Sequence, residues 1–242
     1  MRLGFQAGAQ GTQYHPQLGE VKYRVQNLSW DPDTQVGQTL ALMLERAAQD
    51  SADPWFKQRA VALAGDGSEK ARAYSLYQHA WKKNGRIKFQ RDEVTGAGIG
   101  GYPEGEVIEC SIRPIDMARY VDEGKGVGDC DDFSCYLAAL LKANGIGCAF
   151  VTVGADERVP TQFSHVYVVA YPVNDSGQVE RLPLDASHGE YPGWEVPNQY
   201  GKYKEWPVWD RLAWLVGNAV GTAALALGIW WGAKQVWKVA HS

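Results

Sequence analysis

The sequence lacks an excess of basic residues, an apolar secretion signal and any cysteine spacing typical of a zinc site. A net charge of -4 argues against a protein that holds nucleic acid through phosphate contacts, so we expect no nucleic-acid partner. Residues 1–20 are rich in glycine and glutamine and contain no continuous apolar core. Without such a signal, we expect the bulk of the chain to stay on the cytoplasmic side.

Cysteine is also scarce, with only Cys110, Cys130, Cys135 and Cys148 in 242 residues. No pair has the CxxC spacing and no histidine lies at zinc-finger distance, so we expect no structural metal site. Reduced thiols are expected in a chain of this size without an export signal. A disulfide and a metal ligand are therefore the weaker interpretations of Cys130, which leaves core packing or a nucleophile.

The composition is that of a folded protein, with 45% hydrophobic and 21% charged residues. The length allows one sizeable domain with additions, or two small domains. We divide the chain into a loosely structured arm (1–33), a globular domain (34–200), a juxtamembrane linker (201–211), a transmembrane helix (212–233) and a short tail (234–242).

Residues 212–233 carry no charge and are apolar on all sides. A helix of this length spans about 33 Å, enough to cross a hydrocarbon core of about 30 Å. Tryptophans flank the run on both sides, as at a membrane interface, and a buried core helix is the alternative. We expect a C-terminal tail anchor, with the globular domain on the cytoplasmic side or in a membrane-containing virion. Two GxxxG pairs could support self-association, namely Gly217 with Gly221 and Gly228 with Gly232.

Residue patterns in the globular part predict an α+β fold. Helical spacing and capping residues predict helices at 39–49, 54–64, 69–84, 112–123 and 131–144. Strand patterns predict extended segments at 20–26, 87–94, 147–154, 164–171 and 179–185. The helical half thus precedes the main sheet.

Cys130 lies in GKGVGDCDDF, at the junction of a glycine-rich turn and the amphipathic helix 131–144. The positive end of a helix favours a thiolate, and the Cys130 backbone N–H could receive the oxygen of a tetrahedral intermediate. Asp129, Asp131 and Asp132 oppose a thiolate, since nearby negative charge raises the pKa of a cysteine. A nucleophilic Cys130 therefore needs an imidazolium close by.

His165 and Asp185 could supply a base and its orienting group. His165 opens the strand 164–171, and Asp185 closes the strand 179–185. Adjacent antiparallel strands would place these side chains next to each other. The three residues would then act as nucleophile, base and orienter, although each alone can be an ordinary polar residue.

The three segments GDCDDFSCYLAALLKANGI, SHVYVVAY and LPLDAS together resemble the transglutaminase-like superfamily of papain-like cysteine enzymes, in order and hydrophobic context. The resemblance covers about residues 74–185. It implies a papain-like core with Cys130 as nucleophile, His165 as base and Asp185 as the third member of the triad. The family often has tryptophan two residues after the histidine, where this chain has Tyr167.

The same resemblance implies acyl transfer through a thioester, without a cofactor. A protein or peptide is the implied substrate. Bacterial and phage-like members are more often hydrolytic, so we expect a cysteine peptidase or amidase. A cross-linking transglutaminase and a non-catalytic, membrane-anchored structural or virion protein that keeps the fold are the alternatives.

Overall fold

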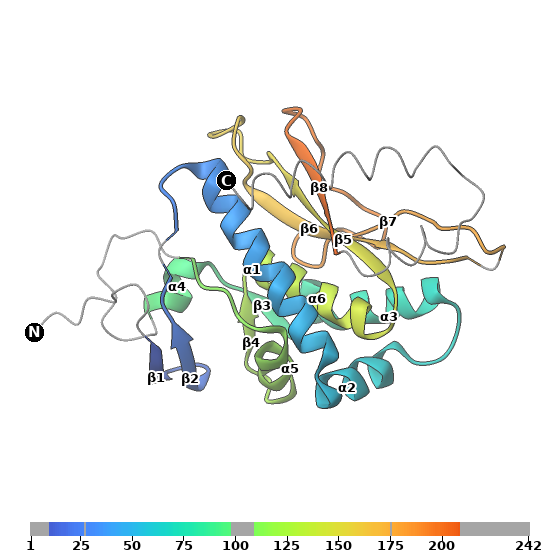
Figure 1. Cartoon of the computed structure of the whole chain (residues 1–242), viewed down its shortest axis with the longest axis horizontal. Coiled ribbons are helices and arrows are strands. Elements are labelled where there is room, and N and C mark those ends of the chain that lie inside the picture. Colours follow the sequence, from blue (N-terminus) through green and yellow to red (C-terminus); the bar gives the residue numbers. More distant parts are fainter. Residues whose placement is uncertain (1–9, 27, 98–108, 175, 209–242) are drawn as a thin grey trace, which may run out of the picture. The chain divides into compact units, whose positions relative to one another are not determined.

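A computed structural model describes residues 10–26, 28–97, 109–174 and 176–208 (Figure 1). Its elements, in chain order, are β1 (Gln10–His15), β2 (Gly19–Arg24), α1 (Pro32–Ala52), α2 (Pro54–Ala64), α3 (Glu69–Ala80), the short 3-10 helix η1 (Lys82–Asn84), β3 (Ile87–Phe89), α4 (Asp92–Ala97), α5 (Pro114–Asp122), β4 (Gly126–Gly128), α6 (Cys130–Ala143), β5 (Gly147–Val153), β6 (His165–Tyr171), β7 (Leu182–Leu184) and β8 (Tyr203–Pro207). The predicted α+β class is confirmed.

Helix α6 is the central element of the core. It contacts α1, α2, α3 and α5 as well as strands β5 and β6, and nearly all of its residues are buried (Figure 1). The helix begins at Cys130 because the side chain of Asp129 accepts a hydrogen bond from the Asp131 backbone N–H at 3.3 Å. Gly145, with φ of 70°, follows the helix and lets the chain reverse in a left-handed conformation. The predicted helix and its glycine stop are therefore confirmed.

The main sheet is antiparallel and has the strand order β7-β6-β5-β8. Alternate residues of β6, including Val166 and Val168, pack in the same core as α6. Because Val168 of β6 is paired with Leu184 of β7, Asp185 continues from β7 toward the first residue of β6, which is His165. The sheet register thus directs two of the predicted site residues toward the same end of the sheet.

The capping residues explain where the first helices begin. Asp31 accepts a hydrogen bond from the Thr34 backbone N–H at 2.9 Å, and Pro32 occupies the first turn of α1. The prediction of a helix at 39–49 was therefore too short at its N-terminus. Asp53 and Ser68 cap α2 and α3, as their sequence positions predicted.

Other segments differ from the sequence prediction. Residues 10–24 form the β1–β2 hairpin, of which only the second strand was predicted, and buried Leu18 and Val21 attach the hairpin to Val127. The extended segment predicted at 87–94 ends at Phe89, because Asp92 begins the short helix α4. The range predicted as a juxtamembrane linker contains β8, which pairs with β5 as an edge strand.

The predicted transmembrane helix, residues 212–233 with its four glycines, lies outside the described residues. Among residues 10–26, 28–97, 109–174 and 176–208, no helix combines the length and the apolar content that a bilayer crossing requires. The membrane anchor stays a prediction.

Candidate active site

Cys130 occupies the first turn of α6, beside the first residues of β6. The hydroxyl of Ser134, one turn further along the helix, lies 2.6 Å from the Cys130 carbonyl oxygen and 3.1 Å from that of Val166. Ser134 is itself buried, so it joins the start of α6 to β6 in the core. This contact fixes the backbone of Cys130 next to the residue that follows His165.

The surroundings of Cys130 favour the neutral thiol. Burial raises the pKa of the Cys130 thiol well above its ordinary value, and the negative charge of Asp129 raises it further. The backbone amide of Val166 acts in the opposite direction by favouring the charged form. The opposing effect that the sequence predicted for Asp129 is therefore present, and a thiolate at neutral pH requires additional positive charge nearby.

His165 and Asp185 form a buried pair. The His165 Nε2 atom lies 2.8 Å from Asp185 Oδ2, and both side chains are almost inaccessible to solvent. Burial acts to raise the pKa of Asp185, but the hydrogen bond and charge of His165 and the His188 backbone N–H outweigh it and lower that pKa. An ionised carboxylate only accepts hydrogen bonds, so His165 Nε2 carries the proton of this hydrogen bond.

The loop after β7 holds the Asp185 carboxylate in place. Its Oδ1 accepts hydrogen bonds from the Ser187 backbone N–H and hydroxyl, both at 3.1 Å, and from the His188 backbone N–H at 2.8 Å. The Tyr77 hydroxyl donates to the Asp185 carbonyl oxygen at 3.2 Å, and the Trp81 indole donates to that of Gly189 at 2.9 Å. The end of α3 therefore positions the loop that orients His165.

His188 is a neighbour of the pair that the sequence analysis did not single out. Its ring packs edge-on against that of His165, with centroids 4.7 Å apart, and Phe89 packs against His188 at 5.1 Å. Burial lowers the pKa of His188, and the charge of His165 lowers it further. In the sequence, Asp185 followed two residues later by Ser187 is typical of a turn. This pattern could have indicated that the loop folds back on Asp185 and brings His188 close to it.

Tyr167, two residues after His165 in β6, is buried beside it. The two rings are stacked with centroids 6.0 Å apart, and the Tyr167 hydroxyl donates to Glu195 at 2.7 Å. The aromatic ring of Tyr167 thus lies against His165 within strand β6.

The structure brings two of the three predicted catalytic residues into direct contact. His165 and Asp185 share a hydrogen bond, whereas within the described residues the Cys130 thiol has no hydrogen bond to either side chain. Cys130 is half-buried, while Cys135 and Cys148 are buried, and all four cysteines of the chain are free. Core packing is therefore the role of Cys135 and Cys148, and Cys130 keeps a partly accessible position at a helix N-terminus.

Two groups of side chains have the composition and proximity of metal-binding sites. One consists of His165, Asp185 and His188, and the other of Asp92, Asp129, Asp131 and Asp132. In the first group, hydrogen bonds with Asp185 and Ser187 already occupy one ring nitrogen of each histidine.

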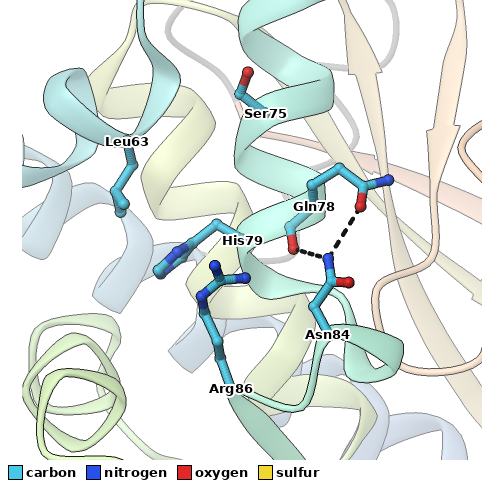
Figure 2. Close-up of a pocket in the computed structure, with 6 residues that line it drawn as sticks. All are labelled: Leu63, Ser75, Gln78, His79, Asn84 and Arg86. Carbon is cyan, nitrogen blue, oxygen red and sulfur yellow. Dashed lines mark hydrogen bonds between the residues drawn. The ribbon is translucent and has the colours of Figure 1, made fainter.

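A separate pocket of about 410 Å³ lies among the helices and contains none of the three predicted catalytic residues. It is lined by Leu63, Ser75, Gln78, His79, Asn84 and Arg86 (Figure 2). Burial, together with the charges of Arg59 and Arg86, lowers the pKa of His79 to about 4, so its ring is neutral at pH 7. The His79 Nε2 atom lies 3.1 Å from the Tyr136 hydroxyl, which ties this ring to α6.

Comparisons with known proteins give distant similarities only. No protein-family model matches the chain, and no curated protein matches it. A crystal structure named "putative protease" from Parabacteroides distasonis is similar with 13% identity and a TM-score of 0.39, over 74% of this chain and 36% of that one. Rad4–Rad23 bound to a 6-4 photoproduct UV lesion is similar with 10% identity and a TM-score of 0.40, over 69% of this chain and 44% of that one. This chain thus spans less than half the length of either structure.

Proposed function

We propose that this chain is a transglutaminase-like cysteine hydrolase that cleaves a peptide or amide bond, with Cys130 as nucleophile, His165 as base and Asp185 as the orienting residue. The observation that carries the proposal is the buried 2.8 Å hydrogen bond between His165 and Asp185. It lies at the start of β6, the strand to which Ser134 joins the N-terminus of α6. A helix packed on an antiparallel sheet, with these residues at one end, supports the papain-like arrangement that the resemblance implies.

The hydrogen bond to Asp185 supports a role for His165 as base, because it leaves Nδ1 as the ring nitrogen that can exchange a proton with Cys130. With Nε2–H directed at Asp185, the free lone pair on Nδ1 can accept the proton of the Cys130 thiol. The sulfur then bonds to the carbonyl carbon of the substrate, and the negative charge moves to the carbonyl oxygen. The leaving amine departs with the proton from His165, and water hydrolyses the thioester and regenerates the thiol.

The N-terminus of α6 supports the transient negative charge. The backbone N–H of Cys130 is at the first position of the helix, where no carbonyl of the same helix can accept it. Together with the positive end of the helix, it is a suitable donor to the substrate oxygen. We therefore keep the Cys130 backbone N–H as the proposed oxyanion contact.

Alkylation of Cys130 tests the proposed base. Iodoacetamide labelling is followed by mass spectrometry between pH 6 and 9, in the full chain and in His165→Ala. The half-buried Cys110 is an internal control, because burial and nearby carboxylates raise the pKa of its thiol too. We expect His165→Ala to slow labelling of Cys130 at pH 7 while leaving Cys110 unchanged. Equal rates at Cys130 in both proteins would refute the role of His165.

The acceptor of the acyl group, water or an amine, is identified with an activity-based acyl probe that forms a thioester with Cys130. Release of the acyl group to water identifies a hydrolase, whereas transfer to an added primary amine identifies the cross-linking alternative. A chain that labels at Cys130 but forms no acyl adduct with any peptide-like probe would favour the non-catalytic structural protein.

We also propose that residues 212–233 anchor the chain in a bilayer, which their uncharged, tryptophan-flanked sequence supports. Flotation with phospholipid vesicles compares the full chain with one that ends at residue 208. The full chain should float and the shortened one should not. A full chain that stays in the aqueous fraction without detergent would contradict the anchor.

A further inference from the structure

The pocket among the helices has the size of a small-molecule site. Its volume is about 410 Å³, and ligand pockets in proteins occupy about 300–1,000 Å³. Leu63 near the end of α2 forms an apolar wall, and residues of α3 and η1 form a polar one (Figure 2). None of the proposed catalytic residues lines it, so the proposed function does not account for this pocket.

The polar wall is held in place by contacts between α3 and η1. Asn84 Nδ2 donates to the Gln78 backbone carbonyl oxygen at 2.5 Å and to Gln78 Oε1 at 3.0 Å (Figure 2). Gly85, with φ of 71°, then turns the chain in a left-handed conformation. Arg86 follows this turn, and its side chain extends toward His79 (Figure 2). The turn after η1 thus brings Arg86 to the same pocket as α3.

His79 supplies a buried polar group to the pocket. Only 9% of this residue is exposed, and its Nε2 atom lies 3.1 Å from the Tyr136 hydroxyl of α6. Within the described residues, the other ring nitrogen, Nδ1, has no hydrogen-bond partner. Buried polar groups in proteins are nearly always hydrogen-bonded, so Nδ1 is a candidate contact for a ligand.

The pocket carries positive charge that no acidic residue of its lining balances. The exposed Arg86 guanidinium has no hydrogen bond or ion pair in the part of the chain that the structure describes. After burial, the charges of Arg59 and Arg86 are the main causes that lower the pKa of His79, so both cations act on this ring. An anion that enters the pocket therefore meets an attractive potential.

We propose that this pocket binds a small organic carboxylate, with the carboxylate on Arg86 and the apolar part of the molecule against Leu63. A planar guanidinium offers two parallel N–H groups, which match the two oxygens of a carboxylate. When the Tyr136 hydroxyl donates to His79 Nε2, the proton of the ring lies on Nδ1, which is then a second donor. A few polar groups beside an apolar wall are typical of small-molecule sites.

The charge of the pocket favours a carboxylate over a phosphate group. A carboxylate carries one negative charge, which the unpaired Arg86 balances. A phosphate monoester carries about 1.5–2 negative charges at pH 7 and would need a second cation. Arg59, whose charge also acts on His79, is already paired with Asp122 at 2.5 Å.

Calorimetric titration with sodium benzoate and sodium hexanoate, a flat and a linear carboxylate, tests the pocket. The full chain is used in mild detergent, and detergent alone gives the blank. We expect saturable binding of one carboxylate per chain. Benzamide and hexanamide have the same shapes without the charge, and they should bind at least about tenfold more weakly, because a hydrogen bond to a charged group contributes about that much.

Variants of the pocket test the role of Arg86. Arg86→Gln should weaken carboxylate binding at least about tenfold, because the guanidinium is lost. Arg91→Gln is the matched control, since Arg91 is also exposed but does not line the pocket, and it should bind as the parent chain does. Ser75→Asp places a negative charge in the lining at an exposed position and should also weaken binding.

Several results would overturn the proposal. If neither carboxylate binds the unmodified chain saturably, the pocket is not a carboxylate site. Tighter binding of inorganic phosphate than of either carboxylate would overturn the class of ligand. Equal weakening by Arg86→Gln and Arg91→Gln would show that the carboxylate binds elsewhere. If Arg86→Gln lacks the circular dichroism of the parent chain, Ser75→Asp decides, and undiminished binding to it would refute the site.

Two further measurements locate the ligand and separate the pocket from the proposed enzyme. In a chain labelled with ¹⁵N-histidine, the ring signals of His79 should shift when the carboxylate is added, and unchanged signals would place the ligand outside the pocket. Cys130→Ala should bind the carboxylate as the parent chain does, because Cys130 does not line the pocket. Loss of binding in Cys130→Ala would show that the carboxylate binds at the proposed active site instead.

Discussion

Removal of the Ser134 hydroxyl should weaken the contact that fixes Cys130 beside β6. The hydroxyl has one proton, shared between the carbonyl oxygens of Cys130 at 2.6 Å and Val166 at 3.1 Å. In Ser134→Ala, the Val166 carbonyl loses a buried donor and no water can replace it easily. Loss of one partner of a buried hydrogen bond costs about 1–3 kcal/mol.

Thermal unfolding followed by circular dichroism measures this cost. For a domain of this size, about 1 kcal/mol shifts the midpoint by about 2–4 °C, so Ser134→Ala should lower it by about 2–12 °C. Ser75→Ala is the matched control, because the Ser75 hydroxyl also donates to the carbonyl four residues earlier but is exposed. That variant should change stability by less than about 0.5 kcal/mol.

The same pair of variants tests whether Ser134 positions the thiol. Alkylation of Cys130 should change in Ser134→Ala, in rate or in its dependence on pH, and should stay the same in Ser75→Ala. If the two variants have the same unfolding midpoint and iodoacetamide alkylates Cys130 in both at the same rate, the Ser134 hydrogen bonds neither stabilise the fold nor position the thiol.

Three other changes follow from the described contacts. Asp50→Ala should destabilise the fold by about 1–3 kcal/mol in urea unfolding, because the buried Asp50 carboxylate accepts hydrogen bonds from the half-exposed Arg113 guanidinium and from the Ile115 backbone N–H, and both donors lose it; an unchanged urea midpoint would contradict this. Gly189→Ala should lower stability and disturb the Asp185 loop, since its Cβ would meet the Tyr77 hydroxyl at 2.9 Å, whereas Gly37→Ala in α1 has open space and should be neutral or stabilising; equal midpoints would refute the contrast. Stability should rise by about 1 kcal/mol or more as the pH falls from 8 to 7, because burial raises the pKa of Asp92 to about 10 and the pKa values of Asp131 and Asp132 well above their ordinary range, so that folding takes up protons there; a fall in the urea midpoint would contradict it.

The part of the site on α6 was readable from the sequence. Helix 131–144 has a continuous apolar stripe, a capping aspartate before Cys130 and a glycine after Asn144, so local chemistry alone defines its ends. Strands 147–154 and 164–171 were equally clear, because long runs of β-branched and aromatic residues rarely form anything else. The position of Cys130 at a helix N-terminus followed directly.

Long-range pairing was not readable in the same way. Strand β8, residues Tyr203–Pro207, is short and partly charged, and only its hydrogen bonds to β5 make it a strand. The proximity of Asp92 to Asp132 likewise depends on how α4 meets the start of α6, which no local pattern encodes. The acidic residues around Cys130 were visible as a run, but their joint burial was not.

The hydrogen bonds from Tyr77 and Trp81 to the Asp185 loop each join residues 108 positions apart in the chain. Contacts between such distant segments close slowly during folding, because a long loop must be ordered before they form. During synthesis, a nascent chain can already contain Cys130 and α3 while residues 185–189 have not yet left the ribosome. The thiol is therefore synthesised before the loop that orients its proposed base, so the complete arrangement can form only after that loop has emerged.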